Sequence, residues 1–307
     1  MGTPEFAVGS LRALLEAGQQ VVGVITAPDR PAGRGRKLHY SAVKEFALEK
    51  GLEPLQPTNL KDQGFLAALK DLDADLQVVV AFRMLPREVW QMPQRGTFNL
   101  HASLLPQYRG AAPINWAIIN GETQTGVTTF FIDEKIDTGT VILQEEEDIL
   151  PGDNAGSLHD RLMSRGARLV VRTCEKISQG NARTVPQPES GELRPAPKLE
   201  RENCRIDWEA PLERIHDHIR GLSPYPGAWS VLKNGDREET LKIFKSDMEP
   251  ALHELPLGRA IREKDVLKVS VKGGFLHILH LQLPGKRRME IREALNGLNL
   301  EKDAYLR

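Results

Sequence analysis

The sequence lacks any apolar run near the roughly 20 residues that a membrane-spanning helix requires, and no basic segment followed by an apolar one stands near its start. It has only two cysteines, Cys174 and Cys204, which are far apart and have no histidine or cysteine at metal-ligand spacing. A disulfide framework and a clustered metal site are therefore not indicated. We expect a cytoplasmic monomer that has no membrane partner, holds no metal and carries two inert thiols.

The sequence also lacks a large excess of one charge. It has 41 Lys and Arg against 42 Asp and Glu, a net charge of −1. This balance argues against indiscriminate binding to nucleic acid, although a local basic patch could still bind it. With 40% hydrophobic and 27% charged residues, the 307-residue chain has the composition of a globular protein, and its length predicts two domains.

Helical patterns alternate with short β-branched runs from residue 4 to about residue 180. This alternation predicts an α/β fold, a Rossmann-like domain with a mostly parallel sheet. Residues 1–4 look like a turn from strand to helix without the preceding strand, so we expect a first, central strand to be absent from this sequence. Helices are predicted over 4–17, 41–51, 62–72 and 154–178 and after Pro113, and strands over 21–25, 53–56, 76–80, 96–101, 126–132 and 141–149.

The second half of the chain has a different pattern. Four prolines amid polar residues mark 181–202 as an extended linker, which separates a domain at 1–180 from another at 203–307. Beyond the linker, a helix near 211–222 precedes short strands separated by turn residues. A small β-barrel of OB-like type fits this pattern best.

Two polar side chains stand at the end of one predicted strand. Asn99 and His101 are two residues apart, so they share a face of that strand. In open parallel sheets, ligands bind beyond the carboxyl ends of strands, which favours a site here. Asp137 lies in a turn between two later strands. The alternatives are that Asn99 and His101 only satisfy loop backbone, and that Asp137 only bonds its own turn.

Two loops are candidate binding segments. Residues 103–113 combine two prolines and a glycine with an apolar Leu-Leu step, which suits a stiff, partly exposed wall for a flat ligand. The second loop is basic and is broken by Pro31, Gly33 and Gly35, so we expect no regular element there and adaptable contacts to an RNA backbone. An ordinary solvated loop is the alternative. Its basic residues are Arg30, Arg34, Arg36 and Lys37.

These motifs together resemble the folate-dependent formyltransferases. The resemblance rests on Asn99-Leu100-His101, Ser103-Leu104-Leu105-Pro106-x-x-Arg109-Gly110 and Asp137-Thr138-Gly139. The branch of this family that acts on methionyl-tRNA is also similar in several longer stretches. These are Gly2–Ala7, Pro28–Lys37, Gly156–Leu162, Ala196–Lys198, Arg205–Trp208 and Pro224–Ala228.

The resemblance implies a function for each part. It implies Asn99, His101 and Asp137 as the catalytic set, and 10-formyltetrahydrofolate as the donor without a metal. The acceptor it implies is the amino group of methionyl initiator tRNA, contacted by the basic loop and by the C-terminal domain. The segment Ala81–Pro86 lacks the family's glycine and is one residue shorter. The folate contacts implied are Ser103, Leu104, Leu105, Pro106, Arg109 and Gly110.

Two other readings remain open. The chain could formylate a small amine or hydrolyse formyltetrahydrofolate, because such enzymes share the Asn/His/Asp set. The basic loop and the second domain argue against a small acceptor. The chain could also be an inactive folate- or RNA-binding module, which the apparent lack of a first strand makes plausible and the intact catalytic set opposes.

Overall fold

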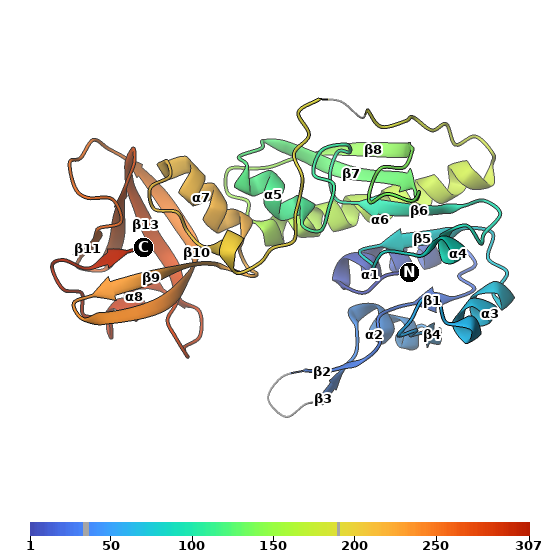
Figure 1. Ribbon diagram of the computed structural model, residues 1–307, viewed down its shortest axis with the longest axis horizontal. Helices are drawn as coiled ribbons and strands as arrows, with labels where there is room; N and C mark the ends of the chain where they lie inside the picture. Colours follow the sequence, from blue (N-terminus) through green and yellow to red (C-terminus); the bar gives the residue numbers. More distant parts are fainter. Residues whose placement is uncertain (33–36, 189–190) are drawn as a thin grey trace. The chain divides into compact units, whose positions relative to one another are not determined.

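The computed structural model describes residues 1–32, 37–188 and 191–307 and divides into two compact units (Figure 1). The first comprises Met1–Pro113, Thr125–Asp148 and His159–Pro195, and the second comprises Ile114–Gln124, Ile149–Leu158 and Ala196–Arg307. The α/β fold class is confirmed. Within the described ranges, no helix combines the length and apolar character needed to cross a membrane.

The first unit alternates helices with short strands, as the sequence predicts. Its helices begin where the sequence supplies caps: the side chains of Ser41 and Asp62 accept hydrogen bonds from the N–H groups of Lys44 and Phe65. Its elements are α1 (Glu5–Glu16), β1 (Val24–Ile25), β2 (Arg30–Ala32), β3 (Lys37–His39), α2 (Ala42–Glu49), β4 (Pro54–Leu55), α3 (Gln63–Asp71), β5 (Gln77–Val80), α4 (Arg87–Trp90), β6 (Thr97–His101), β7 (Gln124–Phe131), β8 (Val141–Asp148) and α6 (Ala155–Ser178).

The strands of this unit form separate ladders. One sheet has the order β5-β6-β7-β8, parallel between β5 and β6 and antiparallel between β6 and β7, while β1 pairs in parallel only with β4. The prediction of a strand over residues 21–25 is wrong for residues 21–23. Only Val24 and Ile25 form β1, because residues 21–23 have no neighbouring strand among the described residues on the side of β5.

The basic segment also differs from its prediction. The expected irregular loop contains two short strands, β2 and β3, which pair antiparallel with Arg30 opposite His39 and Ala32 opposite Lys37. Backbone pairing between the two ends of the segment orders them despite Pro31. Residues 33–36, and with them the predicted tRNA contacts Arg34 and Arg36, lie outside the described residues, and so does the side chain of Lys37.

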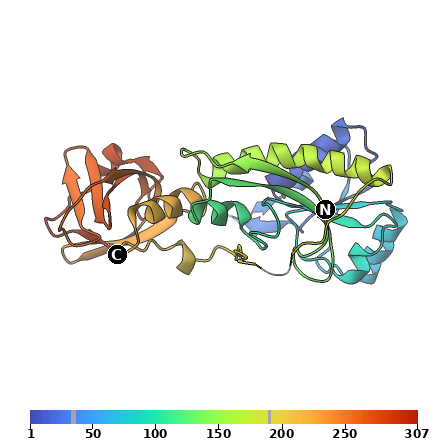
Figure 2. The same cartoon turned by 90° about the horizontal axis from the view of Figure 1, so that it is seen from above.

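The second unit is a nearly closed antiparallel barrel. Its sheet runs β11-β12-β13-β10-β9-β15, and a bridge between Arg259 and Tyr305 joins the two ends of that order. Alternate strand residues and α7 fill one apolar core. Figure 2 shows the strands of this unit, in orange to red, from a second direction. The elements are α5 (Pro113–Ile119), a 3₁₀ turn (Glu202–Cys204), α7 (Leu212–Gly221), β9 (Ala228–Asn234), β10 (Arg237–Pro250), β11 (Ala260–Glu263), β12 (Val266–Val271), β13 (Gly274–Gln282), β14 (Met289–Glu290), α8 (Ile291–Leu295) and β15 (Tyr305–Leu306).

Candidate active site

Strand β6 delivers the predicted pair of polar side chains. Asn99 lies opposite Val79 of β5 and Phe130 of β7, and His101 is the last residue of the strand. Both therefore project from the same face of a strand that has neighbours on both edges. The Asn99 side chain is partly exposed, and no hydrogen bond joins it to another described residue. Its amide is available to a substrate.

His101 is held from two sides. The ring is buried, and its Nε2 lies 2.8 Å from the carbonyl oxygen of Tyr108. A carbonyl can only accept, so Nε2 carries the proton in this contact. Nδ1 then faces the Asp137 carboxylate, 3.8 Å from Oδ2, which is beyond hydrogen-bond length. The Tyr108 carbonyl therefore sets the neutral tautomer, and Asp137 is placed to stabilise the ring once Nδ1 is protonated.

Asp137 is fixed in an unusual backbone conformation. Its φ of 56° lies in the left-handed region, which Asp tolerates better than most residues. Its Oδ2 accepts a 2.9 Å hydrogen bond from the N–H of Gly110. Two residues on, a Cβ on Gly139 would lie 1.7 Å from the carbonyl oxygen of Phe131, so the turn requires glycine there. The predicted Asp-Thr-Gly turn is thereby tied to the Arg-Gly step of the 103–113 loop.

The loop after His101 is more buried than the sequence suggests. Ser103 is fully buried, and its hydroxyl donates to the carbonyl oxygen of Gln107 at 2.6 Å. Leu105 is also buried, and its N–H donates to the hydroxyl of Thr128 on β7. The first hydrogen bond therefore holds the loop from within, and the second ties it to β7. Leu104, Pro106, Arg109 and Gly110 keep partial exposure.

Sequence reasoning missed Gln187, which lies in the predicted linker. Its side-chain Nε2 donates to the carbonyl oxygens of Asp137 at 3.0 Å and Gly139 at 2.8 Å, and its Oε1 accepts from the Arg109 guanidinium at 2.6 and 3.0 Å. One buried amide thus ties the Asp137 turn to Arg109. The only feature of the sequence that distinguishes Gln187 is its place between two prolines. This place favours an extended backbone, but it does not indicate which residues the side chain contacts.

The segment after β5 carries its own unusual residue. Ala81 has a φ of 46°, a conformation that favours glycine, and it stands in the stretch that lacks the family's glycine. The guanidinium of Arg83 donates to the carbonyl oxygens of Pro57 and Thr58. Burial, and secondly the nearby charge of Arg30, lower the pKa of Arg83. This segment is therefore anchored to the loop before α3.

The two cysteines lie apart from the predicted catalytic residues. Cys174 and Cys204 are free and buried, and burial raises the pKa of the Cys174 thiol to about 12. Free, buried thiols agree with the expectation that both are inert, and their reactivity stays a prediction. In the described ranges, no three His, Cys, Asp or Glu side chains gather as metal ligands would.

Comparison with known proteins places this geometry in a family. A model described as "Formyl transferase" matches residues 1–174, and one described as "Formyl transferase, C-terminal domain" matches residues 198–299. A methionyl-tRNA formyltransferase of Flavobacterium johnsoniae is 57% identical over 99% of this chain and 96% of its own length. One of Bacteroides fragilis is 56% identical over 98% of this chain and 94% of its own.

A solved structure supports the fold independently. The N-formyltransferase of Helicobacter canadensis, described in complex with folinic acid and dTDP-3-aminofucose, has a TM-score of 0.62 at 20% identity. The match covers 94% of this chain and 97% of that one. Family models, relatives and fold agree along nearly the whole chain, which belongs to the formyl transferase family.

Proposed function

We propose that this protein transfers the formyl group of 10-formyltetrahydrofolate to the amino group of methionyl initiator tRNA, for translation initiation. The observation that carries the proposal is the 57% identity to a methionyl-tRNA formyltransferase over both units of the chain. We also propose that the protein is cytoplasmic and acts as a monomer. The reaction needs no metal in this proposal, because the formyl unit arrives already activated on the folate.

Asn99 is the proposed oxyanion donor. Attack of the amine nitrogen on the formyl carbon makes a tetrahedral centre with a negative oxygen and a positive nitrogen. The free Asn99 amide can donate an N–H to that oxygen, a contact worth about 3–4 kcal/mol where it has been measured. The intermediate collapses by breaking the bond between the formyl carbon and the folate N10, which takes up a proton.

His101 and Asp137 handle the amine's proton in this proposal. Because Tyr108 holds Nε2–H, Nδ1 is the position of His101 that gains and loses a proton. An imidazolium there faces Asp137 Oδ2 at 3.8 Å, and the partly buried carboxylate stabilises the charge. Nδ1 can therefore donate to the oxyanion or pass the proton on, while Asp137 accepts the amine's proton through water.

The folate donor is proposed to lie against the loop from Ser103 to Gly110. Its partly exposed members, Leu104, Pro106, Arg109 and Gly110, are placed to contact the ligand, and buried Ser103 and Leu105 hold them in position. Residues after Val80 complete the wall. The anchoring of this segment by Arg83 supports a preformed surface there.

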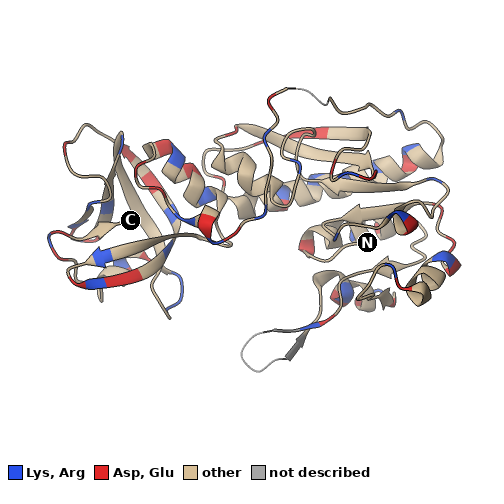
Figure 3. Cartoon of the chain, viewed as in Figure 1, with Lys and Arg blue, Asp and Glu red and all other residues tan. Residues whose placement is uncertain are grey.

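The acceptor side is proposed to involve the basic segment and the C-terminal barrel. Arg30 is exposed and makes no ion pair with another described residue, and its charge acts on neighbouring Arg83. A cation beside a second cation attracts phosphate. Arg34, Arg36 and Lys37 extend the same segment in the sequence. Acidic and basic residues are interspersed over the barrel (Figure 3). Local clusters of basic residues, rather than an overall positive charge, would therefore bind tRNA there.

Labelled formyl transfer tests the proposal. We expect transfer from 10-formyltetrahydrofolate to methionyl initiator tRNA, and little to uncharged tRNA, to amino sugars or to water. Transfer to a small amine alone, or hydrolysis alone, would favour the other formyltransferase chemistries. A folded protein that binds folate and tRNA but transfers nothing would contradict any catalytic role.

A paired substitution tests the basic segment. Arg30→Ala should raise the KM for tRNA several-fold and leave the KM for folate unchanged, because a phosphate contact acts on the acceptor alone. Lys70→Ala, at an exposed cation on α3, is the matched control and should change neither KM. Equal effects of the two variants would remove the specific role of Arg30.

A further inference from the structure

The chain that follows α6 makes a series of hydrogen bonds to the loops of the candidate active site. We call residues 185–188 and 191–194 the strap, and both parts belong to the first unit. The strap begins beside β8, where Val185 and Val141 exchange two backbone hydrogen bonds of 2.8 and 2.9 Å (Figure 1). Its first residues are therefore bonded to the edge strand of the sheet.

The second part of the strap is bonded to two consecutive residues of the 103–113 loop. The side chain of Gln107 donates from Nε2 to the carbonyl oxygen of Glu192 at 3.0 Å, and its Oε1 accepts from the N–H of Arg194 at 2.9 Å. The N–H of Tyr108 donates to the carbonyl oxygen of Arg194 at 2.7 Å. Glu192 and Arg194 are exposed residues, and it is their backbone groups that make these three bonds.

Tyr108 has a backbone conformation that bulky residues seldom adopt. Its φ of 60° lies in the left-handed region, and the residue is buried. Such a conformation persists only where neighbouring groups hold it. The Arg194 carbonyl holds the N–H of Tyr108, and the carbonyl oxygen of Tyr108 accepts from Nε2 of His101 at 2.8 Å. Rotation of Tyr108 to the ordinary region of φ would turn one of its peptide groups relative to the other, so the two contacts cannot both survive it.

The strap also reaches the partner of the other ring nitrogen of His101. The side chain of Gln187 donates to the carbonyl oxygen of Asp137, whose carboxylate faces Nδ1 of the ring. The strap is therefore bonded to the residues on both sides of His101. Arg194 holds Tyr108 on the Nε2 side, and Gln187 holds Asp137 on the Nδ1 side.

We propose that the strap is a positioning element that selects the neutral tautomer of His101, through the backbone hydrogen bond between Arg194 and Tyr108. This role rests on the proposed function, in which Nδ1 of His101 takes up a proton. With the strap bonded, the Tyr108 carbonyl keeps the proton of the neutral ring on Nε2. Without that bond Tyr108 relaxes, Nε2 loses its acceptor, and the ring adopts in part the tautomer with its proton on Nδ1. That tautomer cannot accept a further proton at Nδ1.

A substitution that releases the strap from the loop tests the proposal. Gln107→Met keeps the length of the side chain and removes both of its bonds to the strap. We expect kcat to fall about 10- to 100-fold, because a small displacement of Tyr108 misplaces the proton of His101, while the KM for tRNA stays unchanged. The matched control is Gln91→Met, which removes one exposed hydrogen bond with Arg87 and should leave kcat unchanged.

A substitution within the strap acts without altering the loop itself. Gly191 has a φ of 127°, which L side chains rarely adopt, and no described atom lies within 4 Å of the position of an added Cβ. Gly191→Ala should therefore strain the backbone before Glu192 without a clash, and lower kcat. Gly180→Ala is the matched control, because Gly180 has a φ of 68° and equally open space but precedes the strap. It should leave kcat unchanged.

The tautomer of His101 is the readout that a merely stabilising strap would not change. Nitrogen-15 NMR of the histidine-labelled protein without substrates distinguishes a proton on Nε2 from one on Nδ1, and His101→Gln assigns the signal by its loss. We expect Nε2–H in the unchanged protein and in both controls, and a mixture of tautomers in Gln107→Met and Gly191→Ala.

The two readouts separate failure of this proposal from failure of the proposed function. An unchanged tautomer in both strap variants would overturn the proposal, whatever happens to kcat. A changed tautomer with an unchanged kcat would overturn the catalytic importance of the strap. A changed tautomer in a protein that transfers no formyl group would support the action of the strap on His101 and contradict the proposed function.

Discussion

Two regions of the first unit differ in how their polar groups are satisfied. At the end of β6, His101, Asp137 and Gln187 are tied into one network that includes Arg109, Gly110 and the carbonyl oxygen of Tyr108. Between β1 and β5, which do not pair with each other, the backbone groups of Gly23 and Leu76 make no hydrogen bond to another described residue. The comparison separates a region whose side chains are fixed by hydrogen bonds from one where backbone groups of the described residues are unpaired. Changes in the first should reduce activity, and changes in the second should reduce stability.

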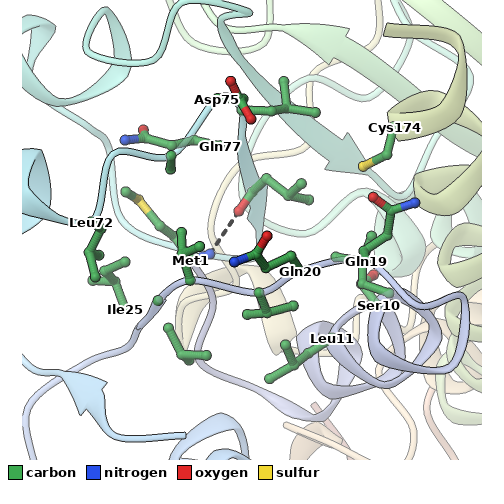
Figure 4. A pocket seen from close by; sticks show the side chains of 18 of the residues that line it. Met1, Ser10, Leu11, Gln19, Gln20, Ile25, Leu72, Asp75, Gln77 and Cys174 are labelled. Carbon is green, nitrogen blue, oxygen red and sulfur yellow. Dashed lines mark hydrogen bonds between the residues drawn. The ribbon is translucent and has the colours of Figure 1, made fainter. Parts of the chain in front are cut away.

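The largest effect is expected from pH acting on the buried amine of Met1, whose hydrogen bond to the carbonyl oxygen of Val78 is drawn in Figure 4. The Met1 amine has a pKa near 8.0 when exposed and about 5 when folded. Between these values the unfolded chain takes up a proton that the folded chain does not. The free energy of unfolding should therefore fall by up to about 4 kcal/mol as the pH drops from 8 to 5. Urea titrations at several pH values measure it.

An N-terminal extension provides the control for this pH effect. The extension converts the Met1 amine into an amide that does not titrate. The extended protein should therefore lose less stability over the same pH range, by the amount that the Met1 amine contributes to the free energy of unfolding. Burial also lowers the pKa values of His216 and His218, and these remain in both proteins. Identical pH profiles for the two proteins would mean that the Met1 amine is not buried.

The next effect is expected at Asn99. Asn99→Ala should lower kcat about 10²- to 10³-fold by removing the oxyanion donor, with almost no change in the free energy of unfolding. Asn115→Ala is a contrasting control, because its amide donates to the carbonyl oxygen of Gly221. That variant should lose about 1 kcal/mol of stability and keep its kcat. Near-wild-type turnover of Asn99→Ala with saturating substrates would end the assignment.

A smaller loss of activity is expected at Gln187, a positioning residue. Gln187→Glu keeps an acceptor for Arg109 but cannot donate to the carbonyl oxygens of Asp137 and Gly139. We expect kcat to fall by about 10- to 100-fold, because displacing the Asp137 turn misplaces its carboxylate. Gln187→Met, which loses both contacts, should do no better. Unchanged kcat and pH profile in Gln187→Glu would show that its bonds to the turn are dispensable.

The smallest effects compare two valines at the start of β1, Val22 just before the strand and Val24 as its first residue. Val24 is 4% exposed, whereas Val22 is 41% exposed. Val24→Thr should cost about 1–2 kcal/mol of stability, because it buries a hydroxyl in an apolar site, and Val22→Thr should cost less than about 0.5 kcal/mol. Urea titrations of the two variants measure the difference. Equal costs for the two substitutions would show that the difference in burial between Val22 and Val24 does not decide stability.

Local pattern was enough for most elements and for the site's first pair. Caps at Ser41 and Asp62 and the apolar periodicity place the helices, because those signals act within one or two turns. The period of two puts Asn99 and His101 on one face. The pattern failed at residues 21–23, because an apolar run indicates a strand without saying whether a partner lies beside it.

By itself, the sequence determined the α/β fold class, the barrel in the second half of the chain, the polar pair on one strand of the site and the motifs that mark the family. Only the tertiary structure decided that Tyr108 sets the tautomer of His101, that Gln187 ties the Asp137 turn to Arg109, and that β1 pairs with β4 and not with β5. The physical reason is the distance along the chain over which each kind of signal acts. Propensity and periodicity act between near neighbours, whereas these contacts join residues that lie far apart in sequence or depend on where loop backbone turns its carbonyl groups.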